Sequence, residues 1–157
     1  MINLIALALL SLHPPGAPAA ADPQMHLSIF IVRGEHSRDT NSSTTTITVD
    51  GTNLVYDQSY TGFRAGSRKP VHIERELRPE ELARLEAIID RNKLLKSHSV
   101  KHDTGQPGSY FMGSIDIKMR SKASSIRLSG MTNLIQDEEL YRKVQVLLDA
   151  IQGIVES

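Results

Sequence analysis

The chain has 157 residues, with 18 basic and 18 acidic side chains and no cysteine. The balanced charge gives no long-range attraction to nucleic acid or to an acidic membrane, so neither partner is expected from charge alone. The lack of cysteine excludes disulfides, thiol catalysis, cysteine-ligated metal and the acylated cysteine of a lipoprotein.

The first 21 residues contain no Asp, Glu, Lys or Arg. An apolar run from Leu4 to Leu12 is followed by prolines and a small-residue tail that ends in Ala19-Ala20-Ala21. This pattern is typical of a secretory signal, although no Lys or Arg precedes the apolar run. The run is too short to span a bilayer. We therefore expect residues 1–21 to be a cleaved signal peptide, residues 22–157 to form one domain, and the protein to be secreted or periplasmic, not transmembrane.

Four strands are predicted in the first half of that domain. Met25–Arg33 is almost continuously apolar from Leu27 to Val32, which predicts a central strand buried on both faces. Asp50-Gly51 lies between Thr44–Val49 and Thr52–Asp57 and predicts a tight hairpin. Apolar and polar residues alternate over 71–77, which predicts a half-buried strand with Arg75 interrupting the inner row. The segments 34–43 and 59–69 are predicted loops.

Two helices and a second hairpin are predicted after residue 78. Pro79 fits the first helical position, and an apolar stripe continues to about Asp90, with Asn92 as the expected left-handed terminator. A loop at 96–109 precedes a strand at 111–120, a turn near 121–123 and a return strand through Ile126 and Leu128. The last helix is predicted at 137–155. This order favours an α+β fold, with about six strands in a single antiparallel sheet (ββββ-α-ββ-α) packed against two helices.

Two groups of residues are candidates for a hydrolase that uses a metal ion or carboxylates. His98, His102 and Asp103 are close in the sequence and are weak candidates for metal ligands, since a loop does not fix their spacing. The second group is His72, Glu74 and Glu76, which project from the same side of one strand. The motifs of serine hydrolases, nucleotide-binding loops and dinucleotide-binding folds are absent. We therefore assign no catalytic residue and expect no cofactor.

Cationic residues form two groups that are candidates for binding an anionic partner. Arg64, Arg68 and Lys69 lie in a glycine-containing loop, and Lys118, Arg120 and Lys122 are predicted to alternate along one strand face. Charged residues also protect an exposed strand edge from pairing with other chains. A glycosylation sequon begins at Asn41, in a predicted loop.

The helix start from Leu77 to Leu82, L-x-P-E-E-L, follows several strands and precedes a hairpin and a final helix. This arrangement is similar to that of emfourin-type inhibitors of bacterial metalloproteases. Arg33-Gly34-Glu35 stands where that family would have paired glycines. The similarity implies a secreted protease-inhibitor-like module, and no functional residue is carried over.

The leading hypothesis is a small exported binding domain without enzymatic activity. Its expected contact surfaces are the three loops at 34–43, 59–69 and 96–109, because loops on a rigid frame commonly carry binding. The expected partner is an extracellular or periplasmic protein or an anionic envelope component. The hydrolase and the inhibitor-like module remain the alternatives.

Overall fold

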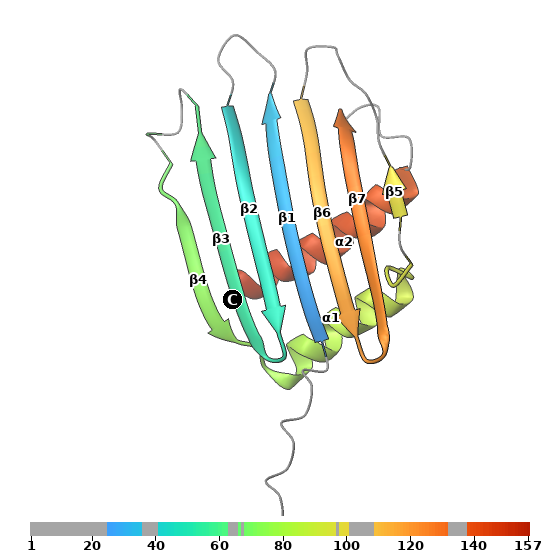
Figure 1. Ribbon diagram of the computed structural model, residues 1–157. Helices are drawn as coiled ribbons and strands as arrows, with labels where there is room; N and C mark the ends of the chain where they lie inside the picture. The colour runs from blue at the N-terminus through green and yellow to red at the C-terminus, as the bar shows by residue number, and fades with distance from the viewer. Residues whose placement is uncertain are drawn as a thin grey trace, which may run out of the picture.

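The part of the protein that the computed structural model describes consists of one layer of strands and one layer of helices. It comprises residues 25–35, 41–62, 66, 68–96, 98–100, 109–131 and 138–157. Seven strands form one sheet in the order β4-β3-β2-β1-β6-β7-β5. Both helices lie on the same face of this sheet (Figure 1). The elements are β1 (Met25–Glu35), β2 (Asn41–Asp50), β3 (Asn53–Thr61), β4 (Val71–Glu76), α1 (Pro79–Arg91), β5 (His98–Val100), β6 (Ser109–Met119), β7 (Lys122–Met131) and α2 (Glu138–Val155).

The predicted α+β fold and the predicted order of its elements are confirmed. The six long strands pair antiparallel. The short strand β5 is an addition, because it lies inside the predicted loop 96–109 and pairs in parallel with residues 126–128 of β7. Three residues are too few to show an alternating pattern, so no pattern of apolar residues indicates β5.

Strands β1, β2 and β3 are longer than predicted at the ends that face the loops. Residues 41–43 and 59–61 were expected in loops, but Ser43 pairs with Tyr60 and Ser42 with Thr61. The sequon at Asn41 therefore begins a strand. These segments are rich in serine and threonine, and the backbone pairing continues beyond the last apolar side chain.

Two tight turns close the opposite end of the sheet. The predicted first hairpin is confirmed, with Asp50 paired to Asn53 and with a left-handed φ of 59° at Gly51. In the second hairpin Met119 pairs with Lys122, and Arg120 takes a φ of 56°. The turn thus lies at 120–121, earlier than predicted. Lys118, Arg120 and Lys122 do not alternate along one strand face, because the chain reverses between the first and the last of them.

The sheet is buried on only one face. Leu27, Ile29 and Ile31 of β1 are at most 3% exposed, whereas Phe30 between them is 46% exposed. The predicted central position of β1 is confirmed, but the prediction that it is buried on both faces is wrong. Both helices pack on the same side, so among the described residues no helix covers the other side of the sheet, here called the open face (Figure 1).

The helices bury the apolar stripes that the sequence predicts. In α2 the six predicted apolar positions are all at most 8% exposed: Leu140, Val144, Leu147, Leu148, Ile151 and Ile154. Helix α1 begins at Pro79 as predicted, and Leu94 after its end is fully buried. The left-handed residue at the C-terminal end is Lys93, with a φ of 55°, and not Asn92.

A partly buried ion pair connects the edge strand β4 with both helices. Arg75 projects from the inner face of β4, and its Nη2 donates to both carboxylate oxygens of Glu81 in α1, at 3.0 Å each. Its Nη1 donates to the carbonyl oxygen of Ile154 near the end of α2, at 2.7 Å. Arg75, the residue that interrupts the predicted apolar row, thus has a structural role.

Glu81 is only 6% exposed and receives further hydrogen bonds from Arg78. The guanidinium of Arg78 donates to Oε1 at 2.7 Å, and its backbone N–H donates to Oε2 at 2.8 Å. The second bond is part of a capping arrangement at the helix start. The hydrogen bonds from the Arg78 side chain and backbone, together with the charge of Arg75, lower the pKa of Glu81 from 4.5 to about 2.

Replacing Glu81 by glutamine should therefore lower stability and change its pH dependence. The lowered pKa means that ionised Glu81 stabilises the fold above pH 4.5, and that this stabilisation is lost as the pH falls towards 2. At pH 7 we expect Glu81→Gln to lower the melting temperature by about 5 °C or more. The difference from the unchanged protein should shrink between pH 4.5 and 2. Glu80→Gln, at an exposed carboxylate of the same turn, is the control, and equal pH profiles for both variants would contradict the assignment.

The one-sided burial of β1 predicts a large loss of stability for one substitution and a small loss for a substitution at the next residue. Ile29→Ala leaves a cavity in the core and should cost about 2–5 kcal/mol of the free energy of unfolding in urea. Phe30→Ala removes a larger side chain from the open face and should cost about 1 kcal/mol or less. Equal losses at the two positions would mean that the open face is covered in solution.

Candidate functional site

The three predicted loops leave the sheet at the same end. Residue 35 of β1 pairs with 41 of β2 and with 109 of β6, and 42 of β2 pairs with 61 of β3. Residue 110 of β6 pairs with 131 of β7. The strand ends that border 36–40, 62–70, 101–108 and 132–137 therefore lie side by side at the upper end of the sheet in Figure 1. We call this the loop end, and the opposite end, with its two tight turns, the turn end.

The predicted cations are divided between these two ends. Arg68 and Lys69 lie at the loop end, just before β4, and the guanidinium of Arg68 is 5.3 Å from the ring centre of Tyr60. Arg64 lies outside the described residues. Lys118, Arg120 and Lys122 are at the turn end. The 11 residues of β1 that connect the two ends span about 33 Å at the usual rise per residue, so a small anion cannot contact both groups.

Of the three predicted cations at the turn end, Arg120 has acidic partners. Arg120 forms ion pairs with Glu86 and Asp90 of α1, at 3.4 and 3.7 Å. On the open face nearby, Arg127 pairs with Asp116 at 3.1 Å. A hydrogen bond from Ser125, followed by those from Arg127, lowers the pKa of Asp116. Arg120 thus joins the second hairpin to α1, a structural role that the sequence analysis did not predict.

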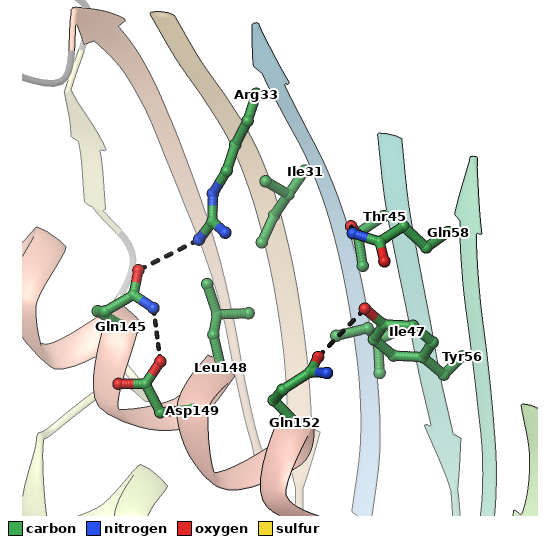
Figure 2. Close-up of a pocket in the computed structure, with 10 residues that line it drawn as sticks. All are labelled: Ile31, Arg33, Thr45, Ile47, Tyr56, Gln58, Gln145, Leu148, Asp149 and Gln152. Atoms are coloured by element: carbon green, nitrogen blue, oxygen red, sulfur yellow. Dashed lines mark hydrogen bonds between the residues drawn. The ribbon is translucent and has the colours of Figure 1, made fainter. Parts of the chain in front are cut away.

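A groove opens between α2 and the inner face of β1, β2 and β3, next to the loop end (Figure 2). Its volume is about 280 Å³. Ile31, Ile47 and Leu148 supply apolar surface, and all three are largely buried. The remaining lining residues are polar: Arg33, Thr45, Tyr56, Gln58, Gln145, Asp149 and Gln152.

Hydrogen bonds between these polar residues set their positions. Arg33 donates to Oε1 of Gln145 at 3.2 Å, and Nε2 of Gln145 donates to Asp149 at 2.6 Å. The hydroxyl of Tyr56 donates to Oε1 of Gln152 at 3.2 Å, from the other side of the groove (Figure 2). Burial raises the pKa of Tyr56, so the phenol is protonated at neutral pH.

The sequence analysis did not single out the groove residues, although a signal was present. The inner row of β1 runs Met25, Leu27, Ile29, Ile31 and then Arg33. The inner rows of β2 and β3 likewise change from apolar to polar towards the loop end, where Thr45 follows Ile47 and Gln58 follows Tyr56. A polar residue that continues an inward-facing row marks a place where the helical layer does not fully cover the sheet.

The residues His72, Glu74 and Glu76 lie on the open face of β4, and all three are exposed. Each has its own neighbour. His72 contacts Asp57 at 2.6 Å, Glu74 accepts a hydrogen bond from Asn53 at 3.5 Å, and Glu76 accepts one from Thr52 at 3.3 Å. The three do not converge on a common point, and the groove lies on the other face.

The candidate metal ligands are only partly described. His98 belongs to β5, while His102 and Asp103 lie outside the described residues. Within the ranges that the structure describes, no three His, Asp or Glu side chains are close enough to hold a metal ion. In the same ranges, no helix has the length and apolarity needed to cross a membrane.

Comparison with known proteins gives no family: no family model matches the chain, and no curated protein matches its sequence.

The contact between His72 and Asp57 predicts a measurable change in titration. The hydrogen bond and the charge of Asp57 raise the pKa of His72 above 6.5. Protonated His72 therefore stabilises the fold below pH 6.5, and this contribution is lost as the pH rises through the higher value. We expect an NMR titration of the imidazole to give a pKa above 6.5 that falls towards 6.5 in Asp57→Asn. Asp116→Asn on β6 is the control. A titration of His72 that Asp57→Asn leaves unchanged would contradict the assignment.

Proposed function

We propose that this protein is a small exported binding domain without enzymatic activity, which binds a protein partner through the loop end. The observation that carries the proposal is the common origin of the predicted loops. Three segments that are far apart in the sequence border strand ends at one end of the sheet. Loops that a rigid sheet holds side by side form a combined surface, as binding loops do on other β-rich scaffolds.

The dimensions of the loop end favour a protein over a small ligand. Six strands from β4 to β7 end there, and at the usual spacing they cover about 24 Å. A surface of this width is comparable to one side of a specific protein interface, which buries about 800 Å² on each partner. The charges favour the same choice, because only Arg68 and Lys69 of the described predicted cations lie at this end.

The packing that stabilises the fold lies apart from the loops that are proposed to bind. The apolar core lies between the sheet and the helices, and the ion pair of Arg75 with Glu81 joins β4 to α1. Within the described part of the chain, the residues of both lie in the helices and strands or directly beside them. The loops can therefore be suited to a partner without loss of the packing that stabilises the fold.

Replacing loop residues should abolish binding without unfolding the protein. We would replace 36–40 and 101–108, separately, by Gly-Ser segments of equal length and capture partners from the extracellular or periplasmic fraction. At least one replacement should reduce capture tenfold or more with little change in melting temperature. Ser121→Gly at the turn end is the matched control and should retain capture.

The same assay separates a protein partner from an anionic envelope component. Capture of a protein partner should persist in 0.5 M salt, at which attraction between exposed charges is largely screened. Capture that is lost in salt and on replacing Arg68 and Lys69 by glutamine would assign the anionic alternative instead. Capture that both loop replacements leave intact would contradict the proposal.

A further inference from the structure

The groove between α2 and the sheet has the features of a ligand site distinct from the loops. Its three apolar residues, Ile31, Ile47 and Leu148, are each at most 8% exposed, and hydroxyl, amide and charged groups supply most of the lining. Sites for small ligands combine apolar surface with polar groups that fix the ligand's orientation, and in this groove the polar groups are the larger part. Of the lining residues only Arg33 is cationic and only Asp149 is anionic.

Arg33 is held in position but keeps hydrogen-bonding capacity. Its guanidinium lies 5.6 Å from the ring centre of Phe111, which in turn packs edge-on against Tyr141. Among the side chains that the structure describes, its one hydrogen-bond acceptor is Gln145, and a guanidinium carries five N–H groups. No carboxylate with a described side chain lies within ion-pair distance of it. A fixed guanidinium without an ionic partner suits a planar, bidentate anion such as a carboxylate.

The one acidic residue of the groove does not neutralise Arg33. Gln145 stands between the two and donates to Asp149 (Figure 2). Gln145 therefore separates the carboxylate of Asp149 from the guanidinium of Arg33 at the rim of the groove. The charge of Asp149 weakens the attraction of the groove for an anion, but the position beside Arg33 that an anion would take is left open.

We propose that this groove binds a carboxylate attached to a small apolar body. The carboxylate pairs with Arg33, the apolar body packs on Ile31, Ile47 and Leu148, and the hydroxyl and amide groups of Thr45, Tyr56 and Gln58 surround it. The volume of about 280 Å³ lies just below the range for drug-sized ligands. It fits a short branched acid or the last residue of a peptide. This inference does not depend on the loop end binding a protein.

The test is a titration of the 15N-labelled protein followed by NMR. The probes are 4-methylpentanoate and its neutral isostere 4-methylpentanamide. The acid should shift the side-chain resonances of Arg33, Gln58 and Gln145, and the amide should bind at least tenfold more weakly. Equal binding of acid and amide, or no shift with either, would overturn the proposal.

Variants assign the binding to Arg33. Arg33→Gln should weaken binding of the acid at least tenfold, whereas Arg84→Gln, at an exposed cation of α1, should leave it within twofold. Asp149→Asn removes the negative charge at the rim and should strengthen binding about twofold or more. Arg33→Lys keeps the charge without the bidentate geometry and should bind with intermediate affinity. Amide spectra and melting temperatures check that each variant is folded, and binding that persists in folded Arg33→Gln would overturn the proposal.

Peptide probes distinguish the two sources of such a carboxylate. Acetyl-Ala-Leu with a free carboxyl end is compared with its amide and with the free acid. Tighter binding of the free-ended peptide assigns the groove to the C-terminus of a polypeptide, and tighter binding of 4-methylpentanoate assigns it to a small organic acid. Either result supports the carboxylate site.

Discussion

The arrangement of the molecule depends on the contact between Arg75 and Glu81. Arg75 lies on the edge strand and binds a carboxylate at the start of α1 and a backbone carbonyl near the end of α2. One side chain therefore connects the edge of the sheet to both helices. Because Glu81 is almost fully buried and also pairs with Arg78, neutralising Glu81 would leave two guanidinium groups without their carboxylate, which is costly. The contact joins the edge strand to both helices, whose apolar stripes pack on one face of the sheet.

That placement determines which surfaces remain for binding. Helix α2 crosses the inner face of the sheet (Figure 1) and leaves a groove beside β1, β2 and β3 (Figure 2). The open face has no helical layer, and Phe30 and Met112 there are about half exposed. The loop end lies away from the contact of Arg75 with Glu81 and away from both tight turns. The sites proposed for binding thus lie where the helices do not constrain the chain.

Local signals in the sequence predicted local structure correctly. Asp50-Gly51 indicated the first hairpin, Pro79 the start of α1, and the spacing of apolar residues the buried stripe of α2. Features that depend on tertiary placement were not predicted. The sequence of β1 does not indicate that both helices pack on one side of the sheet, so the prediction placed Phe30 on a buried face. The turn at Arg120 likewise places Lys118 and Lys122 on different strands, although the two alternate with Arg120 in the sequence.

The same contrast between local signals and tertiary placement explains why the loop end was partly predicted and the groove was not. Loops can be recognised from composition, so the segments that border the loop end were identified before their common location was known. The groove is formed by residues from four elements, and no short motif brings them together. Its only signal is the change along an inner row, where Arg33 follows Ile31 on the buried face of β1. A charge in that position is stable only where the helical layer ends. Arg33 therefore marks both the limit of the core and the place where a ligand can approach the sheet.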